Sequence, residues 1–209
     1  MDGLLIDSEP LWQEAEITVF NKLGVRLTLE MTHQTMGLRT DEVVEYWHKI
    51  YHSEMPSLKD VSEMVDATVI NLIMGKSTAK AGERKAIAVC EPAGLPLAIA
   101  SSSSTLFIKS VLEKLSIADK LTLIHLAHYE EYGKPHPAVY INTAKDLDVH
   151  PNHCLAFEDP VNGVLAAKAA KMKCIAIPEA QSWDDKRFGI ADMLLLSLND
   201  FNREMLNDW

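Results

Sequence analysis

Beyond Lys80, short runs of continuously apolar residues alternate with stretches whose apolar residues recur at helical spacing. Apolar runs this short, bounded by polar or turn residues, are typical of strands buried on both faces. The stretches between them, such as the one with Val161, Val164 and Leu165, are amphipathic. This part of the chain therefore predicts a Rossmann-like α/β core with a parallel sheet, its strands at residues 96–100, 155–157, 174–177 and 193–196.

The chain between residues 11 and 74 has a different pattern, in which apolar residues such as Trp12, Ala15 and Val19 recur three or four positions apart. This spacing predicts helix throughout. Residues that typically begin or end helices divide the stretch at Gly24, at residues 40–41 and at Ser57. We expect an inserted α-helical cap at residues 11–78 and a core formed by residues 1–10 and 79–209.

Composition narrows the classes of function. The 30 acidic and 20 basic residues give a formal charge of −10, which argues against a nucleic-acid partner, because phosphate backbones require clustered Lys and Arg. The 3 cysteines lack the spacing of a disulfide framework or zinc site. The chain shows neither a membrane-spanning apolar run nor a secretory leader, so we expect no membrane partner and a cytoplasmic location.

Ligands of an open parallel sheet bind outside the carboxyl ends of its strands, so functional residues are sought just after each predicted strand. Residues 101–104 are four serines after the first such strand. A hydroxyl and the following N–H groups can hold a phosphate oxygen at a helix N-terminus, and a serine there is equally a common helix cap. Asp2 precedes Gly3 in a turn. When it is considered alone, Asp2 is either a functional carboxylate or a solvated charge.

Lys134 lies in a stiff loop, because Pro135 and Pro137 fix the backbone after it. An ammonium held there can neutralise a phosphoryl group, whereas an isolated Lys before a helix is usually a surface charge. We expect His136 to be a structural or surface residue.

Glu158 and Asp159 follow the predicted strand at residues 155–157. Two adjacent carboxylates at the end of a buried strand repel one another and lose hydration, unless a cation or hydrogen bonds compensate. An oxygen-rich site of this kind suits Mg²⁺, and a helix cap is the alternative. Asn162 and Gly163 would let the next helix pack closely against the site.

These segments occur in the order Asp-Gly turn, helical insertion, strand-Ser, Lys-Pro loop and strand-Glu-Asp. The ordered set resembles the four motifs of the haloacid dehalogenase-like hydrolases, and the resemblance covers essentially the whole chain. Within that superfamily the chain is most similar to the β-phosphoglucomutase-like branch, through residues 2–12, 37–39, 134–137 and 158–163.

The resemblance implies hydrolysis of a phosphate monoester through an aspartyl-phosphate, with Mg²⁺ as cofactor. Asp2 would protonate the leaving sugar oxygen and later activate water, while its backbone carbonyl binds the metal. Asp159 would be a direct metal ligand, and Glu158 would act through a bound water.

The same resemblance implies that Ser101 and Ser102 bind the transferring phosphoryl group and that Lys134 balances its charge. Arg39, on the cap, would face the substrate, or else be a solvated charge at a helix end. The nucleophile would be an Asp one residue before Met1, at the end of a first core strand. We therefore expect about ten further residues upstream, and expect the 209-residue chain without them to be unstable and inactive.

Two alternatives remain open from the sequence. One is a sugar-phosphate mutase of the same branch, although Trp12 stands where such mutases carry a His, and an indole cannot shuttle protons. The other is a non-catalytic binding or regulatory homologue. We expect a monomer that acts on a small phosphorylated sugar, for which hexose, deoxyhexose and hexitol phosphates are all admissible.

Overall fold

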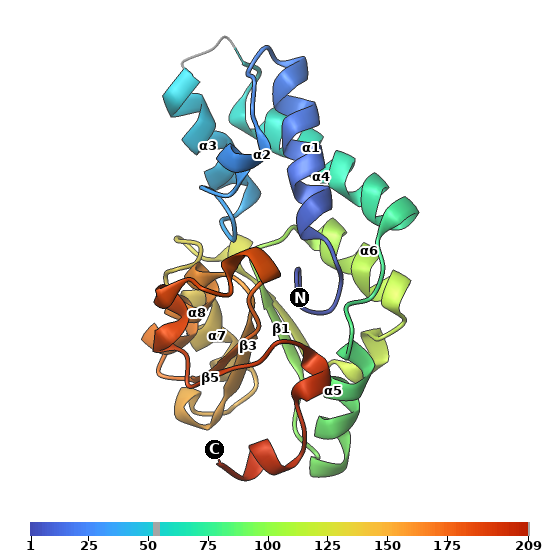
Figure 1. The fold of residues 1–209 in the computed structure, drawn as a ribbon, viewed down its shortest axis with the longest axis vertical. Coiled ribbons are helices and arrows are strands. Elements are labelled where there is room, and N and C mark those ends of the chain that lie inside the picture. The colour runs from blue at the N-terminus through green and yellow to red at the C-terminus, as the bar shows by residue number, and fades with distance from the viewer. Residues whose placement is uncertain (52–54, 209) are drawn as a thin grey trace.

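The computed structural model describes residues 1–51 and 55–208. In this part of the chain, four helices precede an alternating series of helices and strands (Figure 1). The first four are α1 (Glu9–Lys22), α2 (Leu29–Thr32), α3 (Thr40–Tyr51) and α4 (Leu58–Lys76). The later helices are α5 (Glu83–Cys90), α6 (Thr105–Leu115), α7 (Ala138–Asp146) and α8 (Val161–Ala169). The strands are β1 (Ala98–Ser101), β2 (Leu123–Leu126), β3 (Leu155–Glu158), β4 (Lys173–Ala176) and β5 (Met193–Leu194).

The predicted helix breaks are confirmed. Helix α1 ends just before Gly24, whose positive φ of 82° suits glycine at a helix end. Helix α3 begins at Thr40, and the Ser57 hydroxyl caps α4 by accepting a hydrogen bond from the N–H of Asp60. The short helix α2, capped by Thr28, was not predicted.

The pairings between the named strands are all parallel, as the apolar runs predicted, but the strands form two groups. One pairs β1 with β2, and the other has the order β3-β4-β5. The sequence pattern did not predict β2, where His125 interrupts the apolar run. Strand β5 is shorter than the predicted 193–196, and Leu196 is exposed to solvent.

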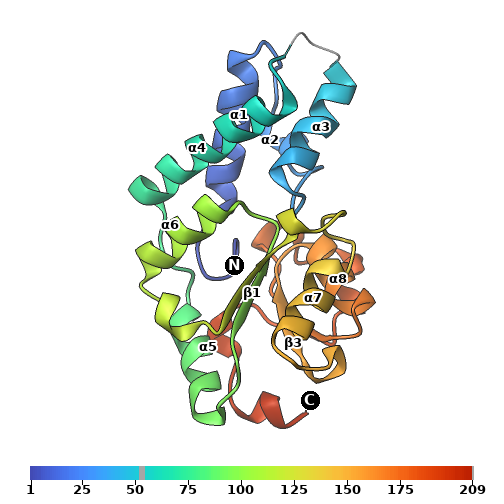
Figure 2. The same ribbon diagram turned by 180° about the vertical axis from the view of Figure 1, so that it is seen from behind.

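Helices α1 to α4 lie together at one end of the molecule, and the strands lie at the other with helices around them (Figures 1 and 2). One apolar cluster joins the two parts, because Val19 of α1 and Val65 of α4 belong to the same buried core as Phe107 of α6. This packing supports a helical cap, whose limits at residues 11–78 remain a prediction.

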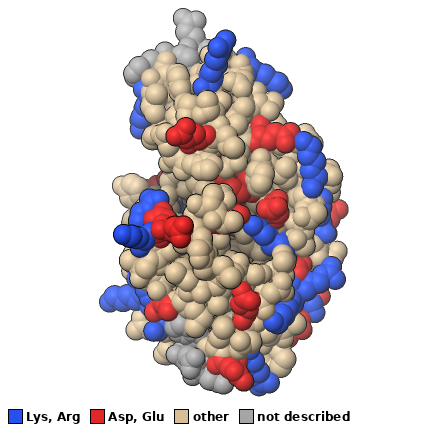
Figure 3. All heavy atoms as spheres, in the orientation of Figure 1, with Lys and Arg blue, Asp and Glu red and all other residues tan. Residues whose placement is uncertain are grey.

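Two features of the structure bear on the expectations from composition: the distribution of surface charge and the apolar character of the helices. Basic and acidic side chains are interspersed over the face drawn in Figure 3. Among the described residues, no helix combines the length and the apolar character needed to cross a lipid bilayer.

Candidate active site

A cleft lies where the carboxyl ends of β1 and β3 face the first helices of the chain. The predicted site residues from four separate segments line it, together with cap residues. Those from the predicted set are Asp2, Ser101, Ser102, Lys134, Glu158 and Asp159. The structure thus brings together every predicted site residue except Arg39.

The Asp2 carboxylate lines this cleft and is held by three donors. Ser8 Oγ donates to its Oδ1 across 2.9 Å, and Trp12 Nε1 donates to the same oxygen across 3.2 Å. Ser103 Oγ donates to Oδ2. The donors come from the α1 N-terminus, from α1 itself and from the loop after β1, so the carboxylate cannot turn without breaking contacts to both parts of the molecule.

Gly3 lets the Asp2 turn lie directly against Asp159. Its φ is +60°, and a Cβ added there would stand 2.2 Å from Asp159 Oδ2. A side chain at this position would therefore push the turn away from the end of β3. The turn bridges the two groups of strands, since Ser103 follows β1 and Asp159 follows β3.

The four serines at residues 101–104, the first of which ends β1, have separate roles. Ser101 is buried, and its hydroxyl accepts a 3.1 Å hydrogen bond from the N–H of Ser103. Ser102 Oγ is buried in the cleft wall without a partner among the described residues, so its hydroxyl is available to a ligand. Ser104 Oγ accepts a hydrogen bond from the N–H of Phe107 and so caps helix α6, which bears out the helix-cap alternative for this serine. Ligand binding by the other serines stays a prediction.

Lys134 is a buried lysine bound to a buried carboxylate, not a surface charge. Its Nζ lies 2.5 Å from Glu158 Oε1 and also donates to the carbonyl of Ala100 across 3.1 Å. Tyr140 Oη donates to the same Glu158 oxygen. Burial and the Glu158 carboxylate raise the pKa of Tyr140 well above its ordinary value, which keeps it a donor. His136 accepts a hydrogen bond from the N–H of Ala138 at the start of α7, in agreement with a structural role.

Glu158 and Asp159 differ in their surroundings. Glu158 packs so tightly against α8 that a Cβ at Gly163 would come within 2.0 Å of its Oε2, which explains the glycine there. Asp159 faces the cleft, and burial together with the Glu158 carboxylate raises its pKa well above the ordinary range. Among the described residues no group of three or more His, Cys, Asp or Glu side chains is arranged to hold a metal. The two carboxylates nevertheless fit a hard cation, because a cation offsets their mutual repulsion and Mg²⁺ needs few protein carboxylates.

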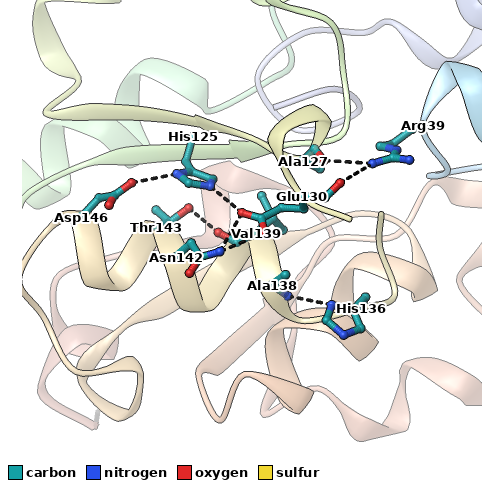
Figure 4. A network of polar contacts seen from close by, with 10 residues as sticks. All are labelled: Arg39, His125, Ala127, Glu130, His136, Ala138, Val139, Asn142, Thr143 and Asp146. Carbon is teal, nitrogen blue, oxygen red and sulfur yellow. Dashed lines mark hydrogen bonds and ion pairs between the residues drawn. The ribbon is translucent and has the colours of Figure 1, made fainter. Parts of the chain in front are cut away.

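Arg39 lies outside the lining of the cleft and joins the cap to the core (Figure 4). Its Nη1 donates to the carbonyls of Ala127 and Glu130 across 3.1 and 2.9 Å, and its guanidinium also pairs with Asp41. The Glu130 side chain in turn binds His125, which also contacts Asp146 on α7. The predicted contact of Arg39 with substrate stays untested.

The sequence patterns missed several polar residues of the site. Ser103 and Tyr140 were not singled out, and neither were the carboxyls of Glu9 and Glu16, which line the cleft. Burial raises the pKa of Glu9 to about 7 and, with the charge of Glu9, that of Glu16 to about 8. A signal for Glu16 was present, because it lies four residues after Trp12 on the face of α1 that should be apolar.

Comparison with known proteins decides the family. Residues 1–177 match the family model described as haloacid dehalogenase-like hydrolase. The chain belongs to the haloacid dehalogenase-like hydrolase family. It is 40% identical over 207 residues to hexitol phosphatase B of Escherichia coli strain K12. The alignment covers 99% of this chain and 93% of that relative.

Solved structures support the fold. The crystal structure of CbbY from Rhodobacter sphaeroides in complex with phosphate superposes with a TM-score of 0.87 at 24% identity, over 96% of this chain and 92% of the other. The β-phosphoglucomutase from Clostridium difficile gives a TM-score of 0.86 at 20% identity, over 99% and 92%. These superpositions confirm the predicted α/β fold. The family match and the 40% identity to hexitol phosphatase B bear out the resemblance to the haloacid dehalogenase-like hydrolases.

Proposed function

We propose that this haloacid dehalogenase-like hydrolase is a Mg²⁺-dependent phosphatase for hexose, deoxyhexose or hexitol phosphates. The observation that carries the proposal is the Asp2 carboxylate, held by Ser8, Trp12 and Ser103 in the cleft that Lys134 and Asp159 also line. The identity with hexitol phosphatase B supports the class of substrate. The three free thiols support a location in the reducing cytoplasm. We also propose that the protein is a monomer.

The proposed reaction has two steps. An aspartate carboxylate attacks phosphorus, the ester P–O bond breaks, and the leaving sugar oxygen takes the proton of the Asp2 carboxyl. Asp2, now a carboxylate, accepts a proton from water as the water oxygen bonds to phosphorus, which releases phosphate and the aspartate. The proposal takes as nucleophile the aspartate that family resemblance puts one residue before Met1.

The phosphoryl group would be bound at the end of β1 and balanced by Lys134. Ser101, Ser102 and the N–H groups after β1 supply donors, and the nearby ammonium offsets negative charge as it develops on the phosphoryl oxygens. Catalysis of this kind depends on positioning and charge neutralisation. The stiff Lys-Pro loop and the buried Glu158 that binds Lys134 support both.

We propose the Asp2 carbonyl, Asp159 and, through water, Glu158 as ligands for Mg²⁺. When bound, the ion would neutralise charge on the phosphoryl oxygens. The support from this chain is the pair of adjacent carboxylates, of which only Glu158 has an ion-pair partner among the described residues.

Trp12 favours hydrolysis over a mutase reaction. Its indole N–H can donate to Asp2 but cannot exchange protons with a second sugar hydroxyl, as a histidine could. The test is phosphate release from a panel of sugar phosphates in Mg²⁺, compared with isomer formation from the same substrates. Isomer formed without release of phosphate would contradict the proposal.

A further inference from the structure

Glu16 is a buried carboxyl that the proposed chemistry does not use. It lies on α1, its side chain is 8% exposed, and its Oε2 has no hydrogen-bond partner among the described residues. Burying a polar atom without a partner destabilises a fold, because the atom loses its hydrogen bonds to water. Glu9, the other carboxyl on this helix whose pKa is raised, differs because it accepts a hydrogen bond from Gln13.

The unpaired Glu16 carboxyl lines the part of the cleft that the cap helices form. Trp12, whose indole contacts Asp2, marks the catalytic end of the same helix. Glu16 lies four residues further along α1, which corresponds to a rise of about 6 Å. A ligand whose phosphoryl group lies beside Asp2 must therefore extend along α1 to reach Glu16. A chain of several carbons can do this, and inorganic phosphate cannot.

The neighbouring cleft wall offers hydrogen-bond acceptors, whereas Glu16 offers a donor. Thr32 and Thr35 are buried there and use their hydroxyl hydrogens on the backbone carbonyls of Leu29 and Thr32, so their oxygens remain as acceptors. Burial keeps Glu16 protonated near neutral pH, with its pKa raised to about 8, so it can donate. Donors and acceptors side by side suit the hydroxyls of a polyol.

We propose that Glu16 is a specificity-determining residue that hydrogen-bonds a hydroxyl on the part of the substrate furthest from the phosphate. The inference rests on the proposed function, and it narrows the substrate class to phosphate esters with hydroxyls several carbons from the phosphoryl group.

Binding measurements in Mg²⁺ test this without requiring turnover, on the full chain preceded by the expected strand with Asn as its last residue; this chain is the wild type of the comparison. The probes are sorbitol 6-phosphate and inorganic phosphate, titrated calorimetrically into wild type, Glu16→Leu and Glu16→Gln. Glu14→Gln is the matched control, since Glu14 lies on the same helix but is exposed and paired with Lys76. We expect Glu16→Leu to bind sorbitol 6-phosphate about 10-fold more weakly and phosphate unchanged. Glu16→Gln should keep most of the affinity, because an amide still donates.

Thermal unfolding separates this effect from misfolding. Leucine removes the unpaired carboxyl, so Glu16→Leu should melt no lower than wild type while binding less well. Equal affinity of wild type and Glu16→Leu for sorbitol 6-phosphate, or equal losses for both probes, would overturn the role of Glu16 alone. Failure of wild type to bind either probe would instead overturn the proposed function, and this inference with it.

Discussion

Trp12 donates its indole N–H to the Asp2 carboxylate across 3.2 Å, so a helix of the cap holds the proposed acid and base of the core. The indole is fixed in turn against Phe107 of α6, with ring centroids 4.9 Å apart. The orientation of Asp2 thus depends on how α1 packs on α6. A change in that packing would reach the site through one hydrogen bond.

Trp12→Phe should slow the proposed reaction, which is measured, like every activity below, in a chain that carries a strand ending in Asp before Met1. Phenylalanine keeps the aromatic packing and removes only the donor, and a hydrogen bond to a charged group contributes about 1.5–3 kcal/mol. We expect kcat to fall about 10- to 100-fold, with KM for the phosphate ester nearly unchanged. Trp183→Phe is the control, because Trp183 is partly exposed and lies outside the cleft lining. A KM effect without a kcat effect would contradict this role.

Tyr140→Phe should weaken the metal site as well as the fold. The hydroxyl donates to Glu158, whose remaining partner is Lys134, so its loss leaves a buried carboxylate less well satisfied. We expect the free energy of unfolding to fall by about 1.5–3 kcal/mol and the Mg²⁺ concentration for half-maximal activity to rise. Tyr46→Phe, which loses an exposed hydrogen bond to Gln34, should change neither. An unaltered Mg²⁺ requirement in Tyr140→Phe would show that Tyr140 does not affect metal binding.

Stability should depend on pH through Glu16. Its pKa is raised from 4.5 to about 8 by burial, so between these values the folded protein holds a proton that the unfolded chain has lost. Binding of more protons by the folded state means that the free energy of unfolding falls as the pH rises through this window. The total is on the order of a few kcal/mol, and Glu9 contributes in the same direction.

Urea unfolding at pH 5 and pH 8 measures this dependence. Glu16→Gln should lose much less stability than wild type between the two pH values, and Glu14→Gln should behave like wild type. The same pH dependence in wild type and Glu16→Gln would show that Glu16 titrates normally.

Arg39→Ala should impair large substrates more than small ones. The guanidinium joins the cap to the carbonyls of Ala127 and Glu130. Under the proposed function a hexose phosphate would extend to the cap residues of the cleft, whereas a small aryl phosphate would not. We expect kcat/KM to fall more for a hexose phosphate than for a small aryl phosphate. Lys49→Ala is the control, since its pair with Glu45 is exposed. Equal losses on both substrates would exclude Arg39 from substrate selection.

The sequence predicted the site residues that follow strands better than those within helices. Ser101 and Asp159 both line the cleft, as expected for residues at the carboxyl ends of parallel strands, although β1 and β3 belong to separate groups of strands. Ser103, Tyr140 and Glu16 required three-dimensional contacts. Tyr140 looks like an ordinary apolar-face residue of α7, and only its distance to Glu158 reveals the hydrogen bond.

Strand β2 and the role of Arg39 were harder to predict for other reasons. The β2 segment contains His125, whose imidazole binds Glu130 and Asp146 at the sheet surface, so its apolar pattern is broken. The contacts of Arg39 join residues about ninety positions apart, which no local pattern encodes.

In the proposed mechanism a neighbouring aspartate attacks phosphorus, while Asp2 gives a proton to the leaving sugar oxygen and later takes one from water. The most direct measurement is phosphate release from sorbitol 6-phosphate in Mg²⁺ by a chain that carries a strand ending in Asp before Met1. We predict Mg²⁺-dependent turnover, a loss of about 10²- to 10⁴-fold in Asp2→Asn, and negligible turnover when the added Asp is replaced by Asn. Ordinary turnover by the 209-residue chain without the added strand, or full activity of Asp2→Asn, would contradict the mechanism.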